Sequence, residues 1–439
     1  MPAKAFTADK FESGHAFDGS SIAGWKGIQA SDMLLLPDPA TAQHRSVHGQ
    51  RRRFIITCDV IEPSDGKGYE RDPRSLAKRA EAYLKSTGIG DVAYFGPEPE
   101  FFIFDAVEWS IDMSGSYCKV FSSEAPWSSA EKFEGGNMGH RPPIKGGYFP
   151  VPPVDSLQDI RSAMCLAMEA MGVEVEVHHH EVAAAGQCEI GTKFAPLVQR
   201  ADWLQILKYA RAQHRARLWQ DGDVHAEAHR RRQRLGHARA SVDLARAART
   251  CSPATATRVC PNMALYYIGG IIKHAKALNA ITNPGTNSYK RLVPGFEAPI
   301  NLAYSARNRS AACRIPYVSN PKGRRVEVRF PIRRCNPYLA FAAMLMAGLD
   351  GVQNKIHPGD PMDKNLYDLE PEEAAKVPHP CASLDEALDN LDKDREFLTR
   401  GGVSSPTTCS TRTSPSRWRR SHGFRMTTHP LEYDMYFSL

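Results

Sequence analysis

Hydrophobic and polar positions along the chain follow two periods, one typical of strands and one typical of helices. Apolar runs and stretches of alternation predict strands over residues 32–37, 54–58, 94–104, 173–182 and 325–329. Apolar residues at helical spacing predict helices over residues 72–87, 155–172, 201–210, 264–278 and 337–350. The first of these helices starts at Asp72, which can cap it, and ends before Gly88 and Gly90.

Two stretches between these elements have the composition of functional loops. Residues 17–25 combine Gly and Ser with an acidic residue and can order around a ligand, although such a stretch is as often a simple turn. Residues 110–154 are rich in Gly, Pro, Ser and aromatic residues. We expect one long loop there, and a loop of that length suggests function rather than simple connection.

Length and composition indicate a globular enzyme. The 439 residues suffice for two domains, and the apolar share of 42% and the charged share of 24% are ordinary. No apolar run is long enough to span a bilayer, and no signal-peptide pattern opens the chain, so we expect no membrane partner. The ten cysteines form no Cys-x-x-Cys pair, which predicts reduced thiols and a cytoplasmic protein.

The net charge of +7 comes from three unusual segments. Residues 211–262 hold eleven arginines against four acidic residues, and residues 41–53 and 404–424 each hold four arginines and no acidic residue. Without these segments the chain is acidic, so its charge does not indicate a nucleic-acid partner. The arginine run at residues 230–234 also lacks the interleaved aromatic residues that stack on bases.

Acidic residues on predicted strands are the first candidates for chemistry. Glu98 and Glu100 stand two residues apart in an apolar, aromatic strand, so both carboxylates point to the same face. Two adjacent carboxylates in an apolar setting repel each other and favour a divalent cation between them. The alternative is a pair of solvated charges on an edge strand.

A histidine cluster precedes a third acidic residue. His178, His179 and His180 lead to Glu181, and Glu189 follows eight residues later. Neighbouring strand residues face opposite sides of a sheet, so at most two of these histidines could bind one ion. We therefore expect the histidines to pack and to orient Glu181, and we do not expect a zinc site.

Basic residues gather between residues 287 and 329, together with a fifth acidic residue. Arg325, Glu327 and Arg329 share one face of a predicted strand. Guanidinium groups beside carboxylates suit substrates that carry phosphate and carboxylate groups. The alternative is an ion-pair network that only stabilises the fold.

Together the acidic residues form an all-oxygen set, consisting of Glu98, Glu100, Glu181, Glu189 and Glu327. Such a set favours Mg²⁺ or Mn²⁺ over Zn²⁺. Two metal ions with a ring of Arg and Lys are suited to phosphoryl transfer. The chain has no Gly-x-x-x-x-Gly-Lys motif, which excludes a P-loop enzyme.

With these residues the chain resembles the bacterial type I glutamine synthetases. The matching motifs are Phe17-Asp-Gly-Ser-Ser, Gly96-Pro-Glu-Pro-Glu-Phe-Phe, Val177-His-His-His-Glu-Val, Asn283-Pro-Gly-Thr-Asn-Ser-Tyr-Lys-Arg-Leu-Val-Pro-Gly and Gly323-Arg-Arg-Val-Glu-Val-Arg-Phe-Pro. The resemblance implies an α+β fold. A small N-terminal β-grasp domain, truncated at its start, would occupy residues 1–71, and a large catalytic domain with a curved antiparallel sheet flanked by helices would occupy residues 72–439.

The resemblance also implies a reaction and its partners. ATP would phosphorylate the γ-carboxylate of L-glutamate, and ammonia would displace the phosphate to give glutamine, ADP and phosphate. The implied cofactors are two divalent cations per site, Mg²⁺ or Mn²⁺, with ATP as a substrate. The implied assembly is a dodecamer with sites between subunits, and regulated members also have an adenylyltransferase as a partner.

Roles for single residues follow from the same resemblance. The metal ion nearer glutamate would be held by Glu100, Glu181 and Glu189, and the ion at the ATP phosphates by Glu98 and Glu327. The glutamate carboxylates and the transferred phosphate would contact Arg291 and Arg329. The nucleotide would contact Glu176, Arg309, Arg314, Lys322 and Arg325.

Three more residues have implied roles outside these sets. Asp18 of a neighbouring subunit would deprotonate ammonium. Glu297 would form part of a flap that excludes water, which would otherwise hydrolyse the acyl phosphate. Tyr367 matches the tyrosine that is adenylylated in regulated members.

The chain departs from the family pattern at its start and in its arginine-rich segments. Residues 211–262 lack the motif Gly-Asp-Asn-Gly-Ser-Gly-Met-His-x-His, whose first histidine binds the nucleotide-side metal ion. We interpret four segments as products of reading-frame slips, since GC-rich codons read out of frame give arginine-rich sequence: residues 41–53, 211–262, 332–335 and 404–424. The missing histidines would then overlie residues 238–241, and sequencing of the gene tests this hypothesis.

A catalytically inactive relative is the alternative if residues 211–262 are real as written. The chain would then lack a metal ligand and a large part of its core. An assay of γ-glutamyl transfer with Mn²⁺, on protein of this literal sequence, separates the two hypotheses.

Overall fold

The computed structural model describes residues 7–22, 24–44, 54–112, 114–132, 137, 139–183, 185–217, 242–244, 261–292, 300–306, 308–317, 319, 325–332, 334–405 and 421–422. Most of the segments interpreted as reading-frame slips, residues 238–241 included, lie outside the described residues. The chain divides into two compact units. Unit 1 comprises Met1–Pro97, Phe194–Gln205 and Asp243–Ser421, and unit 2 comprises Glu98–Lys193, Ile206–Val242 and His422–Leu439.

The N-terminal part of unit 1 is a small antiparallel sheet. Its strands lie in the order β1 (His15–Asp18), β2 (Asp32–Pro37) and β5 (Cys58–Ile61), with the short helix α1 (Lys10–Ser13) before them. A separate pair consists of β3 (Gln43–His44) and β4 (Phe54–Ile55). Met33 on β2, Val60 on β5 and Tyr69 after β5 form the buried core of this part, and Phe17, Trp25 and Leu35 pack against it.

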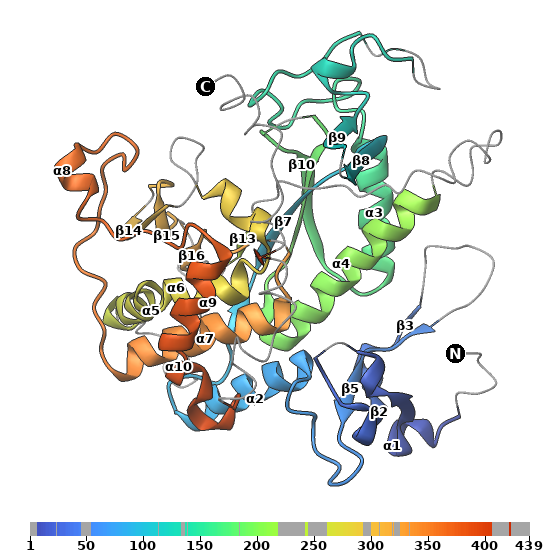
Figure 1. The fold of residues 1–439 in the computed structure, drawn as a ribbon, viewed down its shortest axis with the longest axis vertical. Helices are drawn as coiled ribbons and strands as arrows, with labels where there is room; N and C mark the ends of the chain where they lie inside the picture. Colours follow the sequence, from blue (N-terminus) through green and yellow to red (C-terminus); the bar gives the residue numbers. More distant parts are fainter. Residues whose placement is uncertain are drawn as a thin grey trace. The chain divides into compact units, whose positions relative to one another are not determined.

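The rest of unit 1 is mainly helical and is arranged around one helix that is buried over most of its length. The helices are α2 (Pro73–Ser86), α5 (Pro261–Lys273), α6 (Ala275–Thr282), α7 (Pro337–Gln353), α8 (Pro371–Ala374), α9 (Leu384–Lys393) and α10 (Glu396–Thr399). Helix α7 is apolar on all sides and packs against α2, α5 and α6 (Figure 1). It approaches α5 so closely that a Cβ atom on Gly351 would lie 2.0 Å from the Tyr266 carbonyl oxygen.

Short strands complete unit 1. Strand β15 (Ala311–Ile315) pairs in parallel with β14 (Asn301–Ala306) and antiparallel with β16 (Glu327–Val328). Strand β6 (Tyr94–Phe95) pairs antiparallel with β12 (Ala195–Pro196). Helix α4 (Leu197–Arg217) and strand β13 (Val242–Leu244) continue from one unit into the other along the chain.

Unit 2 contains the sheet on which the predicted acidic residues lie. Strand β11 (Gln187–Thr192) is central and pairs antiparallel with β10 (Val175–His180) and with β7 (Pro97–Phe102). Helix α3 (Gln158–Ala170) packs on β10 and β11 (Figure 1). One face of this sheet is therefore covered by a helix.

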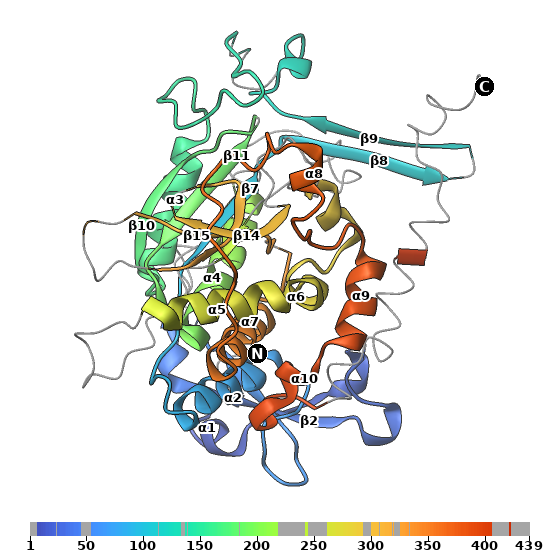
Figure 2. The same ribbon diagram turned by 90° about the vertical axis from the view of Figure 1, so that its left-hand side faces the viewer.

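The structure corrects the prediction of one long loop over residues 110–154. Strands β8 (Ala106–Asp112) and β9 (Gly115–Phe121) form a long antiparallel hairpin, which Figure 2 shows in side view. Val107, Trp109 and Ile111 alternate with polar residues, so the strand period was present in the sequence. The Asp112 carboxylate accepts hydrogen bonds from the backbone of the turn at Ser114, which stabilises the hairpin turn.

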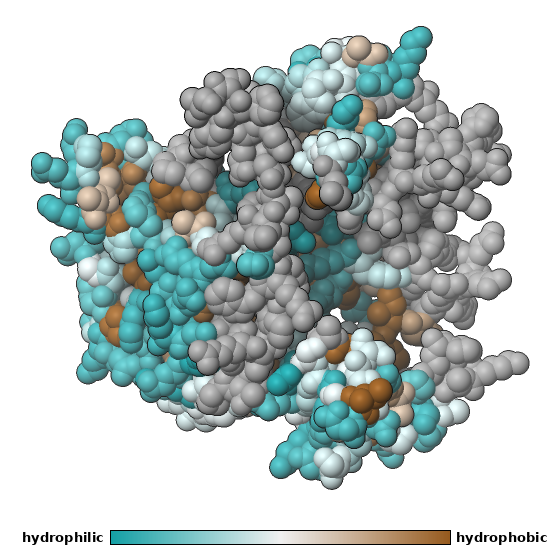
Figure 3. Space-filling model, viewed as in Figure 1, coloured by the Kyte–Doolittle hydropathy of each residue, from teal (hydrophilic) through white to brown (hydrophobic). Residues whose placement is uncertain are grey.

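On the side shown in Figure 3 the described surface is mainly hydrophilic, with hydrophobic residues in small groups. None of the helices in the described part of the chain combines the length and apolar character that a membrane-spanning segment requires.

Candidate metal centre

Three side chains form a row across three neighbouring strands of the sheet in unit 2. His179 on β10 lies opposite Glu189 on β11, and Glu189 lies opposite Glu100 on β7. Directly opposed residues of antiparallel strands point to the same face, with Cβ atoms about 4.5–5.5 Å apart. We call this side of the sheet the acidic face. Glu98 belongs to it as well, because it stands two residues before Glu100 on the same strand.

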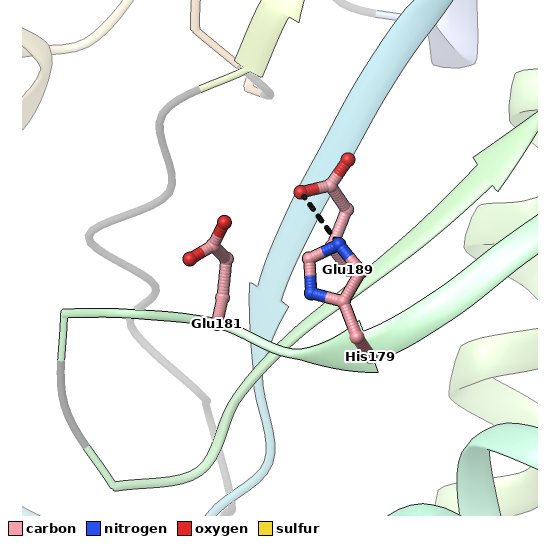
Figure 4. A group of neighbouring side chains, drawn as sticks. All are labelled: His179, Glu181 and Glu189. Atoms are coloured by element: carbon pink, nitrogen blue, oxygen red, sulfur yellow. Dashed lines mark ion pairs between the residues drawn. The ribbon is translucent and has the colours of Figure 1, made fainter. Parts of the chain in front are cut away.

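Glu181 joins this row from the end of β10. Figure 4 shows the side chains of His179, Glu181 and Glu189 on the same side of the sheet. One ligand atom from each of the three lies within 4.8 Å of the others, and His179 Nε2 is 3.7 Å from Glu189 Oε2. The backbone N–H of Glu181 donates to the carbonyl of Gln187 at 2.9 Å, which fixes where the chain leaves β10.

The other two histidines point to the opposite face, where His178 contacts α3. The Arg161 guanidinium of α3 lies 3.4 Å from His178 Nδ1 and 3.7 Å from Cys188 Sγ, and its own ion-pair partner is Asp155. His178 and His180 thus face one side of the sheet and His179 faces the other, as expected for alternate residues of a strand. His180 is fully buried on this face.

Glu124 anchors His180. Its carboxylate is buried, and no sequence motif pointed to it. His180 Nε2 lies 3.0 Å from Glu124 Oε2, and the same oxygen accepts from the Gly186 backbone at 2.8 Å. His180 Nδ1 lies 2.7 Å from the Gly147 carbonyl oxygen and 3.0 Å from that of Glu181. His180 contacts Glu181 at one end of the segment between β10 and β11, and Glu124 contacts Gly186 at the other, so the pair holds both ends.

The pKa shifts agree with this pairing. Burial alone would raise the pKa of Glu124, but hydrogen bonds from His180 and Ser156 outweigh it, so its pKa lies below the ordinary value. Burial alone would lower the pKa of His180, but the hydrogen bond and charge of Glu124 outweigh it, so its pKa lies above the ordinary value. Both shifts favour an imidazolium–carboxylate pair beneath the acidic face.

The residues of the acidic face suit a hard divalent cation. Carboxylate oxygens of Glu181 and Glu189 approach each other beside an imidazole, and Glu100 lies in register with Glu189. Carboxylates held this close repel one another unless a cation lies among them. Mostly oxygen donors favour Mg²⁺ or Mn²⁺ over Zn²⁺.

Comparison with known proteins decides the family. A sequence model described as "Glutamine synthetase, catalytic domain" matches residues 70–436, and one described as "Glutamine synthetase, beta-Grasp domain" matches residues 1–63. The chain belongs to the glutamine synthetase family. As a member, it is a ligase of glutamine biosynthesis, and nothing in these similarities supports the inactive relative.

Relatives within and around the family are similar over nearly their whole length. A protein named 3-hydroxylaminophenol mutase, from Cupriavidus pinatubonensis, is 60% identical, and the alignment covers 100% of this chain and 93% of that protein. The glutamine synthetase of Methylococcus capsulatus is 57% identical with the same coverage. The solved structure of the Plasmodium falciparum glutamine synthetase is 27% identical, with a TM-score of 0.84, covering 99% of this chain and 91% of that one.

In unit 1, the structure brings one predicted acidic residue together with two predicted arginines. Glu327 lies opposite Arg314 in the β15–β16 pair, with Arg314 Nη1 2.7 Å from Glu327 Oε2. Arg329 Nε lies 3.3 Å from Glu327 Oε1. Guanidinium groups beside a carboxylate suit phosphate- and carboxylate-bearing ligands, and an ion-pair network alone also accounts for this arrangement.

Asp18 ends β1 with an exposed carboxylate. The hydroxyls of Ser20 and Ser21 each donate to it at 2.6 Å, and the Ser20 backbone N–H donates at 2.8 Å. The side-chain bond from Ser20, then that from Ser21, holds the pKa of Asp18 below its ordinary value. The acidic loop residue is therefore an oriented, ionised carboxylate.

Other predicted residues lie on the surface or outside the described part. Glu176 is exposed on β10 at a break in its register, Arg309 is exposed in the turn before β15, and Arg325 and Tyr367 are half-buried. Glu297 and Lys322 lie outside the described residues. Arg291 ends the 3₁₀ helix Thr286–Arg291, but its side chain is not among the described ones.

Of the residues around the acidic face, Glu124 and Gln187 were not predicted from the sequence, and His179 was predicted only in part. His179 was expected to pack and to orient Glu181; it stands two residues before Glu181 and lies on the same face, and the pairing register places it opposite Glu189. Glu124 and Gln187 carried no motif of their own. A signal was available for Gln187, which stands two residues before Glu189 and so shares its face.

Proposed function

We propose that the acidic face binds the divalent cation of an ATP-dependent glutamate–ammonia ligase. The observation that carries the proposal is the row of His179, Glu189 and Glu100 with Glu181 beside it. Glu100, Glu181 and Glu189 would hold the cation nearer glutamate. When bound, the cation would supply Lewis-acid polarisation and charge neutralisation at the reacting oxygens.

The chain's own side chains would handle the anions and the ammonium ion. Arg291 and Arg329 would bind the glutamate carboxylates and transferred phosphate. Nucleotide contacts would come from Glu176, Arg309, Arg314, Lys322 and Arg325. Asp18, ionised and oriented by two serines, would attract ammonium and take its proton, and Glu297 would help to exclude water.

The finer features of the family are part of the same proposal. Glu98 and Glu327 would hold a second Mg²⁺ or Mn²⁺, and the β-grasp and catalytic domains would meet near residue 71. The enzyme would be a dodecamer with Asp18 supplied by a neighbouring subunit, and an adenylyltransferase would modify Tyr367. Because the reaction consumes ATP and glutamate, which are made inside the cell, the proposal includes a cytoplasmic location.

The test is formation of glutamine by the full chain, with ATP, L-glutamate, ammonium and Mg²⁺. Glutamine and ADP should appear in equal amounts, and Glu189→Gln should abolish both. The matched control is Glu174→Gln, because Glu174 is an exposed glutamate that pairs with Lys193 at 2.6 Å. A wild-type protein that hydrolyses no ATP and forms no glutamine would refute the proposal.

A second candidate activity is the rearrangement of 3-hydroxylaminophenol. It is favoured by the 60% identity to the relative of that name, over the full length of this chain. The protein should be incubated with 3-hydroxylaminophenol without ATP, and isomeric products separated by chromatography. Formation of an isomer supports this activity, and unchanged starting material removes it.

A further inference from the structure

Gln187 connects two of the proposed metal ligands from the first residue of β11. Its side chain is almost completely buried. Its Nε2 donates a hydrogen bond to Glu100 Oε2 at 2.6 Å, and its Oε1 accepts one from the Ala183 backbone N–H at 2.6 Å. Its backbone carbonyl accepts the hydrogen bond of Glu181 N–H at 2.9 Å.

These contacts fix the orientation of the amide without ambiguity. The Ala183 N–H can only donate, so it requires the amide oxygen, and the NH₂ group is then directed at the carboxylate of Glu100. The ionised Glu100 carboxylate can only accept hydrogen bonds, so it requires the NH₂ group. Each end of the Gln187 amide therefore meets the partner it needs. A single side chain thus holds Glu100 on β7 and the segment that follows Glu181.

We propose that Gln187 is a positioning residue, which orients Glu100 and Glu181 before a cation binds and thereby sets the affinity of the acidic face for Mg²⁺ or Mn²⁺. The inference rests on the proposed function, since it assigns Gln187 a task at the same site. Removal of a group that hydrogen-bonds to a metal ligand typically lowers metal affinity or activity by about 10–100-fold. Gln187 makes such a bond to Glu100 and, through Ala183, supports Glu181.

The first experiment measures Mn²⁺ binding to the full chain without substrates, from the electron paramagnetic resonance signal of free Mn²⁺. Gln187→Met keeps the length of the side chain and removes both hydrogen bonds, so affinity should fall about tenfold. The control is Cys188→Ala on the next residue of β11, which is buried on the opposite face near Arg161. It should change affinity by less than about twofold, well below the effect expected for a ligand-orienting contact.

Two further readouts distinguish positioning from general stability. The spectrum of bound Mn²⁺ should change shape in Gln187→Met, because the carboxylate geometry around the ion changes. The Mn²⁺ concentration for half-maximal activity should rise, while kcat at saturating Mn²⁺ changes little. If Gln187→Met binds Mn²⁺ as the wild type does, or if Cys188→Ala weakens binding equally, the inference is wrong.

A measurement on the unaltered protein covers the case in which Gln187→Met does not fold. In cation-free wild type, amide exchange at Ala183 should be slow, because its N–H is already bound to Gln187. Exchange at the rate of an unstructured amide would overturn the inference.

The same data separate this inference from the proposed function. A wild-type protein that binds Mn²⁺ tightly but forms no glutamine would refute the ligase and leave the Gln187 result readable. A wild-type protein that binds no Mn²⁺ would refute both.

Discussion

Two clusters of charged side chains, one in each unit, surround their carboxylates with opposite kinds of neighbour: Asp350 in unit 1 is buried, and Glu181 and Glu189 in unit 2 are half-buried. In unit 1, Asp350 on α7 is surrounded by cationic or protonatable groups: His274 Nε2 at 2.9 Å, Lys273 Nζ at 3.2 Å and Arg400 Nη1 at 2.9 Å. In unit 2, one carboxylate oxygen each of Glu181 and Glu189 and a ring nitrogen of His179 lie within 4.8 Å of one another.

The Asp350 carboxylate stabilises the fold, whereas the carboxylates of the acidic face are suited to bind a cation. Asp350 has its counter-charges within its own unit, so folding alone compensates the cost of burying it. The acidic face gathers like charges, which disfavours folding until a cation binds. The comparison therefore predicts opposite effects on stability and on metal binding when each carboxylate is neutralised.

Glu189→Gln should have the largest effect, and the effect should be on binding. Loss of a ligand costs several kcal/mol, which corresponds to at least about a 100-fold fall in Mn²⁺ affinity and in kcat/KM. The thermal unfolding temperature without metal should stay equal or rise, because one of the repelling charges is gone. Calorimetric Mn²⁺ titration and a thermal scan check both statements, and a lowered unfolding temperature would contradict the comparison.

Asp350→Asn should lower the stability of the fold and leave Mn²⁺ binding unchanged. It leaves His274, Lys273 and Arg400 without their shared carboxylate, which should lower the free energy of unfolding by about 3 kcal/mol, the low end for a broken buried ion pair. Urea denaturation measures this loss. Mn²⁺ affinity of the folded variant should equal that of wild type, and a parallel loss of affinity would show that the two clusters are coupled.

Added Mn²⁺ should stabilise the wild type and not Glu189→Gln. At a concentration 100 times the dissociation constant, binding to the native state alone adds about 2.7 kcal/mol. Thermal unfolding with and without Mn²⁺ gives the shift for both proteins. Asp350→Asn is the matched control and should show the full shift, although from a lower starting temperature.

The smallest predicted effect is a pH dependence of the Asp350 contribution. Burial raises the pKa of Asp350, but hydrogen bonds from His274 and Lys273 and the charge of Arg400 outweigh it, so the folded-state pKa is below the ordinary value. The contribution is then complete above the unfolded-state pKa of about 3.9 and is lost as pH falls through the folded-state value. The stability difference between wild type and Asp350→Asn should be constant near neutral pH and shrink below about pH 4. Urea titrations at several pH values test this. A stability difference between the two proteins that shrinks as the pH rises would contradict the prediction.

Local patterns predicted most of the elements but not all of their limits. Asp72 caps α2 by accepting from the backbone of Arg74 and Ser75, as the sequence indicated. The single helix expected over residues 264–278 is divided into α5 and α6 at His274, where contacts with Asp350 and Asp394 fix the ring. Those contacts join residues far apart in the chain, so no local pattern contains them.

The sequence predicted which carboxylates belong to the candidate site, but it did not predict how they are arranged in space. The two-residue spacing of Glu98 and Glu100 placed them on one face without any knowledge of neighbouring strands. His179 shares a face with Glu181 by the same spacing, but its position opposite Glu189 depends on strand pairing, which is a long-range property. The same spacing places Gln187 on the face of Glu189, but its hydrogen bond to Glu100 crosses between strands and has no local signal.

The central position of β11 limits how the gene can change in evolution. Residues on this strand alternate between the acidic face and the buried face, with Glu189 on one side and Cys188 and Ile190 on the other. Insertion or deletion of one codon within Gln187–Thr192 would exchange the two sides and bury the carboxylate against α3. Viable length variants among homologues should therefore have their gaps in the connections on either side of this strand, while the strand itself keeps its six residues.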